Sequence, residues 1–396
     1  MNSEFSDFRS FYINHVKPRC NYPPETVPYK TKLANGLAIT VRREHPDDYA
    51  AVENLTRRAF FNAEKLARDG IPCDEHLLVR KLRAAPEFIP ELDLVAECEL
   101  LGQRHIVGNV MFTAAYVKTP SGEFIPALVF GPLSVLPEYQ RMGIGKALLS
   151  RAEEIARSAG WGAIFLYGHP WYYPRLGYKE AKEFAVTTHD GKNFPAFMAK
   201  ELVLGYLSAA AGGKYYYSPV YELDMGEARE FDGAFPPVVD GPQARPLHPS
   251  HLPYIHRLMN LPEILEVMHE RQTDLPVWIS AYQNWTNRGE RAFAIYSGEK
   301  PAGWLRLGGF DGDAGTINVL VIDPRYARRG LGRFAVGFAE GVFRERGLRR
   351  IEIYAAEDNI PARALYESCG FRIAGRGECT TGDGTACMGI TFEKVI

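Results

Sequence analysis

The stretch VFGPLSVLPEYQRMGIGKALL (129–149) decides how this sequence is interpreted, because it returns later in the chain as INVLVIDPRYARRGLGRFAV (317–336). Each copy has an apolar run, then a proline, then two glycines with one residue between them, and then a segment with helical periodicity. Gly143 aligns with Gly330, and the same offset aligns the prolines and tyrosines that precede them. A repeat of this length predicts a domain-sized unit used twice.

The residues on either side of the glycines predict an α/β architecture. Near-continuous apolar runs such as FGPLSVL and TINVLVI are typical of central strands that are covered on both faces. The segment after the second glycine pair has apolar residues at helical spacing, namely Leu331, Phe334, Ala335, Phe338, Ala339 and Val342. Between the copies, FDGAFPPVVDGPQARP (231–246) is rich in glycine and proline and is expected to be the linker, with a boundary near Gly241.

Length, charge and cysteine usage exclude several classes of protein. The 396 residues suffice for two or three domains. The chain has 46 Lys and Arg residues against 48 Asp and Glu residues. Its positive electrostatic field is therefore too weak for non-specific binding to nucleic acid or to an anionic membrane. The start of the chain has no signal-peptide pattern, no apolar stretch reaches membrane-span length, and the six cysteines form no CxxC pair. We therefore expect a cytoplasmic protein with reduced thiols. No metal is expected, since prolines interrupt His248, His251 and His256.

The first loop, QRMGIG (140–145), has the composition of a phosphate cradle. Placed between a strand and a helix, it would gather backbone N–H groups at a helix N-terminus, where the helix dipole also favours an anion. Glycine lets a diphosphate approach the backbone closely. The alternative is that the glycines serve only the packing of a strand-to-helix turn. Neither a P-loop nor a dinucleotide fingerprint is present at these turns.

These motifs together resemble the GNAT superfamily of acyl-CoA-dependent N-acyltransferases. The family pattern is [QR]xxGx[GA] after a strand ending in VxP, followed later by a tyrosine and GF or GY. YYPRLGY (172–178) and NIPARALYESCGF (359–371) resemble that ending in the first and second copies. The residues that match the loop pattern are Gln140, Gly143 and Gly145 in the first copy and Gly330 and Gly332 in the second.

The resemblance covers both halves of the chain and implies a domain organisation. We expect an N-terminal extension (1–35), a first GNAT-like domain with a C-terminal extension and linker (36–240), and a second GNAT-like domain (241–396). The implied fold class is α/β, each domain being a splayed mixed β-sheet flanked by helices. In the extension, Phe5, Phe8, Phe11 and Tyr12 have helical spacing, which leaves a docked helix and a loose arm as alternatives.

The resemblance also implies acetyl-CoA as co-substrate, with its pantetheine arm in the splay and its diphosphate on the glycine loop. Asn359 would reach the cofactor arm in the second copy. The second copy departs from the pattern at Ala327, where the family has Gln or Arg. The residues implied in cofactor binding are Leu133, Ser134, Val135, Gln140, Arg141, Met142, Gly143, Ile144 and Gly145 in the first copy, and Leu320, Val321, Ile322, Arg328, Arg329, Gly330, Leu331 and Gly332 in the second.

The reaction implied is attack of an amine on an acyl thioester, and the leaving thiolate then needs a proton that a tyrosine can supply. By alignment with the family ending, the acids would be Tyr173 and Tyr366, and a packing role is the alternative for each ring. His169 is expected at the mouth of the first site, as a base, a substrate contact or a strand-end cap. The base stays open, and its candidates are Glu75, His76 and His169 in the first copy and Glu357 and Asp358 in the second.

The function expected from the resemblance is transfer of an acetyl group from acetyl-CoA to a primary amine of a small molecule or protein. One alternative is a single catalytic copy beside a degenerate scaffold copy. Another is a module that senses acyl-CoA without catalysis. The tandem arrangement is also similar to mycothiol synthases and to the aminoacyl-transferring enzymes of peptidoglycan synthesis, and no sequence feature selects either.

Overall fold

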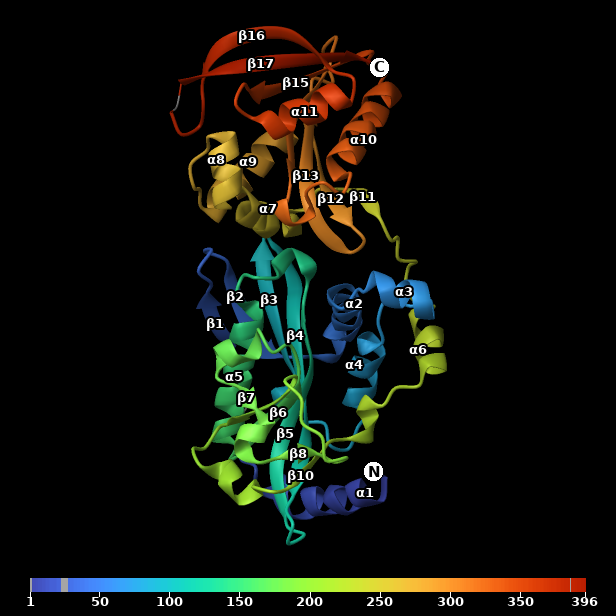
Figure 1. Cartoon of the computed structure of the whole chain (residues 1–396), viewed down its shortest axis with the longest axis vertical. Helices are drawn as coiled ribbons and strands as arrows, with labels where there is room; N and C mark the ends of the chain where they lie inside the picture. The colour runs from blue at the N-terminus through green and yellow to red at the C-terminus, as the bar shows by residue number, and fades with distance from the viewer. Residues whose placement is uncertain (1, 23–27, 385) are drawn as a thin grey trace.

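The computed structural model describes residues 2–22, 28–384 and 386–396, and each half of the chain forms its own mixed β-sheet (Figure 1). Figure 1 shows the second half stacked on one end of the first, with helices on both faces of each sheet. This confirms the predicted α/β class with two splayed, helix-flanked sheets.

The first sheet has the strand order β1-β2-β3-β4-β5-β6-β9-β7, and β10 pairs with β4 and β8 beside it. Neighbours along the path are antiparallel except β5 and β6, which run parallel. The strands are β1 (Tyr29–Lys32), β2 (Ala38–Arg43), β3 (Leu94–Leu100), β4 (Gln103–Lys118), β5 (Phe124–Val135), β6 (Ala163–Tyr167), β7 (Lys179–Glu180), β8 (Thr187–Thr188), β9 (Phe197–Glu201) and β10 (Lys214–Tyr216).

Alternation along β3 shows how helices cover both faces of this sheet. Leu94 and Ala96 belong to the core cluster that includes Leu148 of helix α5, whereas Val95 packs with Val52 and Val79 on the other face. The helices of this half are α2 (Tyr49–Ala59), α3 (Ala63–Asp69), α4 (Glu75–Arg83), α5 (Ile144–Ser158) and α6 (Met225–Asp232). The predicted amphipathic helix after the first glycine loop is α5.

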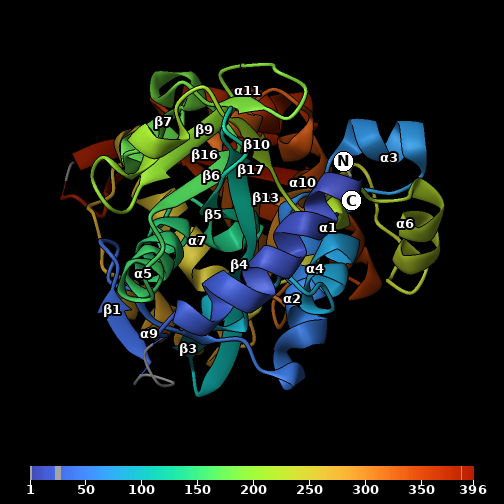
Figure 2. The same ribbon diagram turned by 90° about the horizontal axis from the view of Figure 1, so that it is seen from below.

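The N-terminal residues form a helix, α1 (Asn2–Phe11), that lies across the lower end of the first half (Figure 2). Phe8 is fully buried, and its ring centroid lies 4.2 Å from that of Tyr116 on β4. The side chain of Phe5 lies outside the described residues. Of the two alternatives left by the sequence, the structure therefore has the docked helix.

The second sheet repeats the plan with the order β11-β12-β13-β14-β15-β17-β16, in which β14 and β15 are parallel. Its strands are β11 (Pro242–Pro246), β12 (Arg291–Ser297), β13 (Lys300–Gly308), β14 (Gly315–Ile322), β15 (Arg350–Ala356), β16 (Arg372–Thr380) and β17 (Ala386–Val395). Its helices are α7 (Leu252–Met259), α8 (Pro262–Met268), α9 (Leu275–Asn287), α10 (Leu331–Glu345) and α11 (Ile360–Ser368).

The two halves share a core. A short 3-10 helix, η5 (Pro137–Tyr139), stands just before the first glycine loop and contacts α7 and β13 of the second half. Tyr139 and Met142 belong to the same buried cluster as Leu252 and Trp304. The second half therefore packs directly against the segment that leads into the first loop. Among the residues that the structure describes, none of the helices is long and apolar enough to cross a bilayer.

Candidate functional site

In each sheet the parallel strand pair separates at the end nearest the glycine loop. The register joins β5 to β6 at Leu128–Ile164 and Val129–Phe165, after which β5 runs on to Val135. Likewise β14 pairs with β15 from Gly315–Ile351 to Ile317–Ile353 and then runs on to Ile322. Backbone N–H and C=O groups on a diverging edge require other partners. Both copies therefore present an edge on which an extended chain with amide groups could bind.

The loop at the open end of each splay has a backbone suited to an anion. Arg141 and Gly143 have φ of 66° and 94°, and Arg328 and Gly330 have φ of 59° and 80°. Alternating left-handed and right-handed residues direct successive N–H groups into one concavity. Gly143 and Gly330 are also the N-caps of α5 and α10, and glycine has no side chain with which to satisfy the N–H groups of the first turn.

The two glycines of each loop serve different purposes. The first, Gly143 or Gly330, adopts the left-handed conformation that starts the helix. The second makes room for a later residue. A Cβ on Gly145 would lie 3.1 Å from the Tyr172 hydroxyl, and one on Gly332 would lie 2.9 Å from Cδ2 of Leu365. Tyr172 and Leu365 directly precede the two candidate acids, so the second glycine seats the element that carries the tyrosine. The second glycines therefore serve packing, as the alternative interpretation of the loops proposed. Packing does not account for the first glycines, which adopt the left-handed conformation.

Gln140 connects the first loop to its strand. Its Nε2 donates a hydrogen bond of 3.1 Å to the carbonyl oxygen of Val135, at the end of β5. Ala327 cannot make the equivalent bond in the second copy. Ser134 is buried, and its hydroxyl is 3.0 Å from that of Thr56 on α2, which anchors the diverging part of β5 from the other face.

Tyr173 lies between the two diverging strands of the first copy. Its ring centroid is 5.7 Å from that of Phe130 on β5, and a Cβ on Gly168, just past the end of β6, would fall 2.2 Å from its Cε2. Burial, together with the neighbouring Tyr172, raises the pKa of Tyr173 well above its usual range. The phenol therefore keeps its proton at neutral pH, as a general acid must.

Tyr366 occupies the corresponding position on α11 but is enclosed by other aromatic rings. It is 5% exposed, and its centroid is 6.1 Å from that of Phe371 and 5.7 Å from that of Phe392. Tyr173 stands in the same relation to Tyr178, at 5.8 Å. Burial and, secondarily, Cys369 raise the pKa of Tyr366, so it too is a protonated phenol.

His169 and Asn359 lie next to the ends of β6 and β15. His169 is exposed, its ring is 5.4 Å from that of Trp171, and its carbonyl oxygen accepts a 3.0 Å bond from the N–H of Tyr172. Asn359 is the N-cap of α11, where its Oδ1 accepts a 3.1 Å bond from the N–H of Ala362. The amide nitrogen of Asn359 remains the group with which it could contact a cofactor arm.

The structure separates the candidate bases. Nε2 of the fully buried His76 is 3.1 Å from Asp232 of α6, and its Nδ1 is 3.4 Å from Cys73, so it fastens α4 to α6. Burial raises the pKa of the neighbouring Glu75. In the second copy, Glu357 accepts from Arg376 at 2.5 Å and Asp358 accepts from His269 at 2.8 Å. Glu357 and Asp358 directly follow the end of the splayed strand β15, whereas Glu75 and His76 lie on α4.

The arginines after η11 (Pro324–Tyr326) are partly occupied by other contacts. The guanidinium of Arg329 lies 5.5 Å from the ring centroid of Tyr326, and Arg333 donates to the carbonyl oxygen of Ser368 at 3.1 Å. Arg328 holds the left-handed position equivalent to Arg141. The second loop therefore keeps the backbone geometry of the first while its side chains brace α11 and η11.

The three histidines that first suggested a metal have separate partners. His251 Nδ1 accepts from the N–H of His248 at 2.9 Å, and His256 Nε2 is 2.9 Å from the carbonyl oxygen of Thr273. Within the described ranges, no group of three or more His, Cys, Asp or Glu side chains could hold a metal ion.

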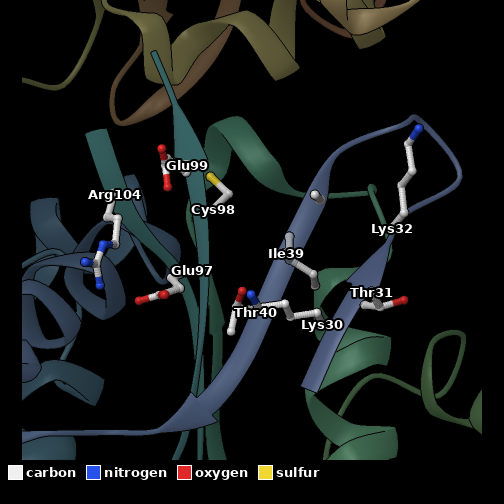
Figure 3. A pocket seen from close by; sticks show the side chains of 10 residues that line it. Lys30, Thr31, Lys32, Ile39, Thr40, Glu97, Cys98, Glu99 and Arg104 are labelled. Carbon is white, nitrogen blue, oxygen red and sulfur yellow. The ribbon is translucent and has the colours of Figure 1, made fainter. Parts of the chain in front are cut away.

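A hollow of about 420 Å³ lies on the outer strands β1, β2, β3 and β4 (Figure 3). Figure 3 shows Glu97 and Arg104 on one side of it and Lys30 and Lys32 on the other. Glu97 is paired with Arg42 at 2.9 Å, so part of its charge is already neutralised. The hollow is lined by residues other than those of the splay and the loop, and we assign it no step of the chemistry.

Sequence reasoning missed the contacts that hold the first loop in place. Glu138 of η5 is 3% exposed and accepts a bond of 2.5 Å from the Tyr296 hydroxyl in the second half, and Arg58 pairs with the same carboxylate. No local pattern marks a pair so far apart in the chain. The contact of Tyr172 with Gly145 did have a signal in the sequence. Tyr172 directly precedes Tyr173 just as Leu365 directly precedes Tyr366, and Leu365 makes the equivalent contact with Gly332.

Comparison with known proteins finds one family match in each half of the chain. A family model described as "Acetyltransferase (GNAT) family" matches residues 255–371, and one described as "Acetyltransferase (GNAT) domain" matches 94–180; together they cover just over half of the chain. The "Uncharacterized N-acetyltransferase YjhQ" of Escherichia coli K12 is 39% identical over 104 residues, which are 26% of this chain and 54% of that protein. The mycothiol acetyltransferase of Beutenbergia cavernae is 46% identical over 68 residues, 17% and 22% of the two chains. The chain thus spans about half or less of these relatives.

Among solved structures, YhbS of Escherichia coli in complex with CoA is 25% identical with a TM-score of 0.40, covering 49% of this chain and 97% of that one. Spermidine N-acetyltransferase of Vibrio cholerae with CoA and spermine is 22% identical with a TM-score of 0.36, covering 39% and 95%.

Proposed function

The chain belongs to the GNAT acetyltransferase family, with one copy of the family's domain in each half, and from this premise we propose that it transfers an acetyl group from acetyl-CoA to a primary amine. Acyl transfer from an acyl-CoA is the activity of the family. The acetyl donor and the amine acceptor are the parts that we add.

One observation carries the proposal: in both copies the parallel strands separate toward a loop whose concave backbone caps a helix with glycine. The open strand edge suits the amides of pantetheine, which need hydrogen-bond partners along an extended path. The loop suits a diphosphate, since unpaired N–H groups and the helix dipole both favour an anion. CoA carries both groups, amides along its pantetheine arm and a diphosphate beyond them.

The residues of the splay then have defined roles. Backbone N–H groups on the diverging part of β5 or β14 donate to the oxygen that becomes negative when the amine attacks the thioester. Tyr173 in the first copy, or Tyr366 in the second, donates its proton to the departing thiolate. His169 in the first copy, and Glu357 or Asp358 in the second, are the candidates to take the proton of the amine. The acceptor is a small molecule or a protein.

A second arrangement, with one working copy and one scaffold copy, is favoured by a single difference between the loops. Gln140 ties the first loop to Val135, whereas Ala327 leaves the second loop without that bond. If only one copy binds acetyl-CoA tightly, we expect it to be the first.

Titration calorimetry of the full chain with acetyl-CoA tests the proposal. We expect two sites, one removed by Gly143→Phe and the other by Gly330→Phe, because a bulky residue at a left-handed position strains the loop and fills its concavity. The matched controls are Gly102→Phe and Gly347→Phe. Both positions have a similar φ, and among the described residues a Cβ there would meet open space.

The outcomes separate the candidates. Two sites that respond only to the loop variants support acetyl-CoA binding in both copies, and one site supports the scaffold arrangement. A chain that binds no acetyl-CoA overturns the proposal. Acetylation of amines, followed by mass spectrometry with each variant, then assigns turnover to a copy.

A further inference from the structure

Two cysteines face each other across the hairpin that ends the second half. Cys379 on β16 and Cys387 on β17 are directly paired in the register, and their sulfur atoms are 2.7 Å apart. Directly opposed residues of antiparallel strands have Cα atoms about 4.5–5.5 Å apart, within the range that a disulfide spans. Both thiols are free and half-buried. The backbone therefore already holds them at a separation that a disulfide can close.

A tyrosine distinguishes the two thiols. The hydroxyl of Tyr354 on β15 donates to the sulfur of Cys379 at 2.7 Å. The contact with Cys387 and this hydroxyl bond lower the pKa of Cys379, while the contact with Cys379 raises the pKa of Cys387. Since the thiolate is the nucleophile in thiol–disulfide exchange, Cys379 is the thiol prepared to attack and Cys387 the one that resolves.

The pair lies on the same side of the domain as the open end of the second splay. The turn of the hairpin bonds to the loop after α8, where the N–H of Asp383 donates to the carbonyl oxygen of His269 at 2.9 Å. His269 in turn contacts Asp358 at the end of β15. Figure 1 shows β16 and β17 at the end of the molecule away from the first half, with α8 between this hairpin and the first half. Low-molecular-weight reagents can therefore approach it without crossing the interface between the halves.

We propose that Cys379 and Cys387 are a redox-active dithiol that reacts with a low-molecular-weight disulfide, of which oxidised glutathione is the type, and closes reversibly to a disulfide across the hairpin. The proposal does not depend on the acyltransferase activity.

The exchange balances in two steps. The Cys379 thiolate attacks one sulfur of oxidised glutathione, the S–S bond of glutathione breaks, and one glutathione leaves as a thiolate that takes up a proton. The Cys387 thiolate then attacks the Cys379 sulfur of the mixed disulfide and displaces the second glutathione. The two cysteines lose two electrons and two protons, and oxidised glutathione gains them as two molecules of reduced glutathione.

The test is a redox titration of the full chain in buffers of graded reduced-to-oxidised glutathione ratio, followed by alkylation and peptide mapping. We expect a Cys379–Cys387 disulfide to form and to be reversed by reduced glutathione. In Cys387→Ser the glutathione adduct should accumulate on Cys379, because the resolving thiol is gone. Cys369 is the internal control, since it is a half-buried free thiol of the same domain.

The role of Tyr354 has its own readout. In Tyr354→Phe the alkylation rate of Cys379 should fall at neutral pH and its rate–pH profile should move to higher pH, while Cys369 is unchanged. The proposal is overturned if Cys379 in Cys387→Ser takes up glutathione no faster than Cys369, or if the wild-type chain forms no Cys379–Cys387 link under oxidising buffers.

Discussion

At the scale of single residues, the two copies place different side chains around equivalent glycines. Gly145 faces the hydroxyl of Tyr172, and Gly332 faces the methyl groups of Leu365. The candidate acid is the residue that directly follows Tyr172 in the first copy and Leu365 in the second. The contact of Tyr172 or Leu365 with the glycine therefore helps to set the position of the phenol. Burial keeps both phenols protonated. The first copy therefore has a hydroxyl beside its second glycine, where the second copy has the apolar side chain of Leu365.

Replacing the candidate acids tests this assignment. Tyr173→Phe and Tyr366→Phe should each lower turnover at their own site by about 10²–10⁴-fold, the range for general acid catalysis, with the affinity for acetyl-CoA retained. Because burial raises the pKa of these phenols, the acid stays protonated through neutral pH, and the wild-type kcat should show no loss from this group between about pH 7 and 9. Steady-state kinetics against pH is the measurement.

Tyr172→Phe is the comparison for the first copy. It removes the hydroxyl beside Gly145 and leaves Tyr173 intact. If Tyr172→Phe abolishes turnover while Tyr173→Phe does not, the proton comes from Tyr172. If neither affects turnover of a chain that binds acetyl-CoA, the first copy is a binding module.

At the scale of elements, α1 shows how a segment without a motif is held in place. Phe8 stacks on Tyr116 of β4, and Arg9 pairs with Glu87, a fully buried carboxylate that also accepts a 3.0 Å bond from Ser218. Because Glu87 is buried, losing a partner would leave a charge without compensation. The helix is thus held by the rings of Phe8 and Phe11, the latter 5.4 Å from the ring of Phe124 on β5, and by the ion pair of Arg9.

The aromatic contact of α1 can be measured directly. Phe8→Ala should lower the free energy of unfolding of the first half by about 3–5 kcal/mol, because it removes a fully buried ring and leaves a cavity. Ile13→Ala is the matched control. Ile13 is 44% exposed, so its truncation should change stability by less than about 0.5 kcal/mol. Denaturant unfolding of both variants gives the comparison, and equal effects would mean that α1 is not docked through Phe8.

At the scale of the whole molecule, a buried hydrogen-bonded chain joins the two halves. The N–H of His248 donates to Nδ1 of His251, Nε2 of His251 lies 2.9 Å from the Tyr296 hydroxyl, and that hydroxyl donates to Glu138. Burial lowers the pKa of His251. Arg58 completes the cluster by bonding Glu138 and, at 3.0 Å, Glu299. The second half thereby fixes Glu138 of η5, two residues before the first glycine loop.

Tyr296→Phe tests this junction and its pH dependence. Burial alone would raise the pKa of Glu138, but Arg58 and the Tyr296 hydroxyl outweigh it and the net shift is downward. A lowered folded-state pKa means that the stabilisation is present above the unfolded value of about 4.3 and is lost as pH falls through the folded value. At neutral pH, Tyr296→Phe should cost about 1.5–3 kcal/mol, as for a hydrogen bond to a charged group, and the cost should shrink in acid.

Tyr254→Phe is the control for the junction. Tyr254 is fully buried on α7 at the same interface, and among the described residues its hydroxyl has no hydrogen-bond partner. Removing that hydroxyl should cost little at any pH. Calorimetric unfolding from pH 7 to about pH 3 measures both variants. Equal costs for the two, or a cost for Tyr296→Phe that grows in acid, would contradict a charged Glu138 at the junction.

The sequence by itself determined the duplicated α/β architecture, the two glycine loops and the family. These follow from local order: an apolar run, a left-handed glycine and an amphipathic stripe act within a few residues of one another, and their repetition shows that the unit is used twice. The family resemblance also supplied Tyr173 and Tyr366 as candidates, because their spacing from the following glycine is local.

Only the tertiary structure decided what surrounds those residues. The rings that enclose Tyr366, the place of Tyr173 between the splayed strands, the docking of α1, the Glu138–Tyr296 bond and the Cys379–Cys387 pair all depend on how distant segments meet. Such contacts are set by the packing of whole elements, and a residue's neighbours along the chain carry no record of a partner on another sheet. For the same physical reason the acceptor, which would contact several loops at once, had no motif in the sequence.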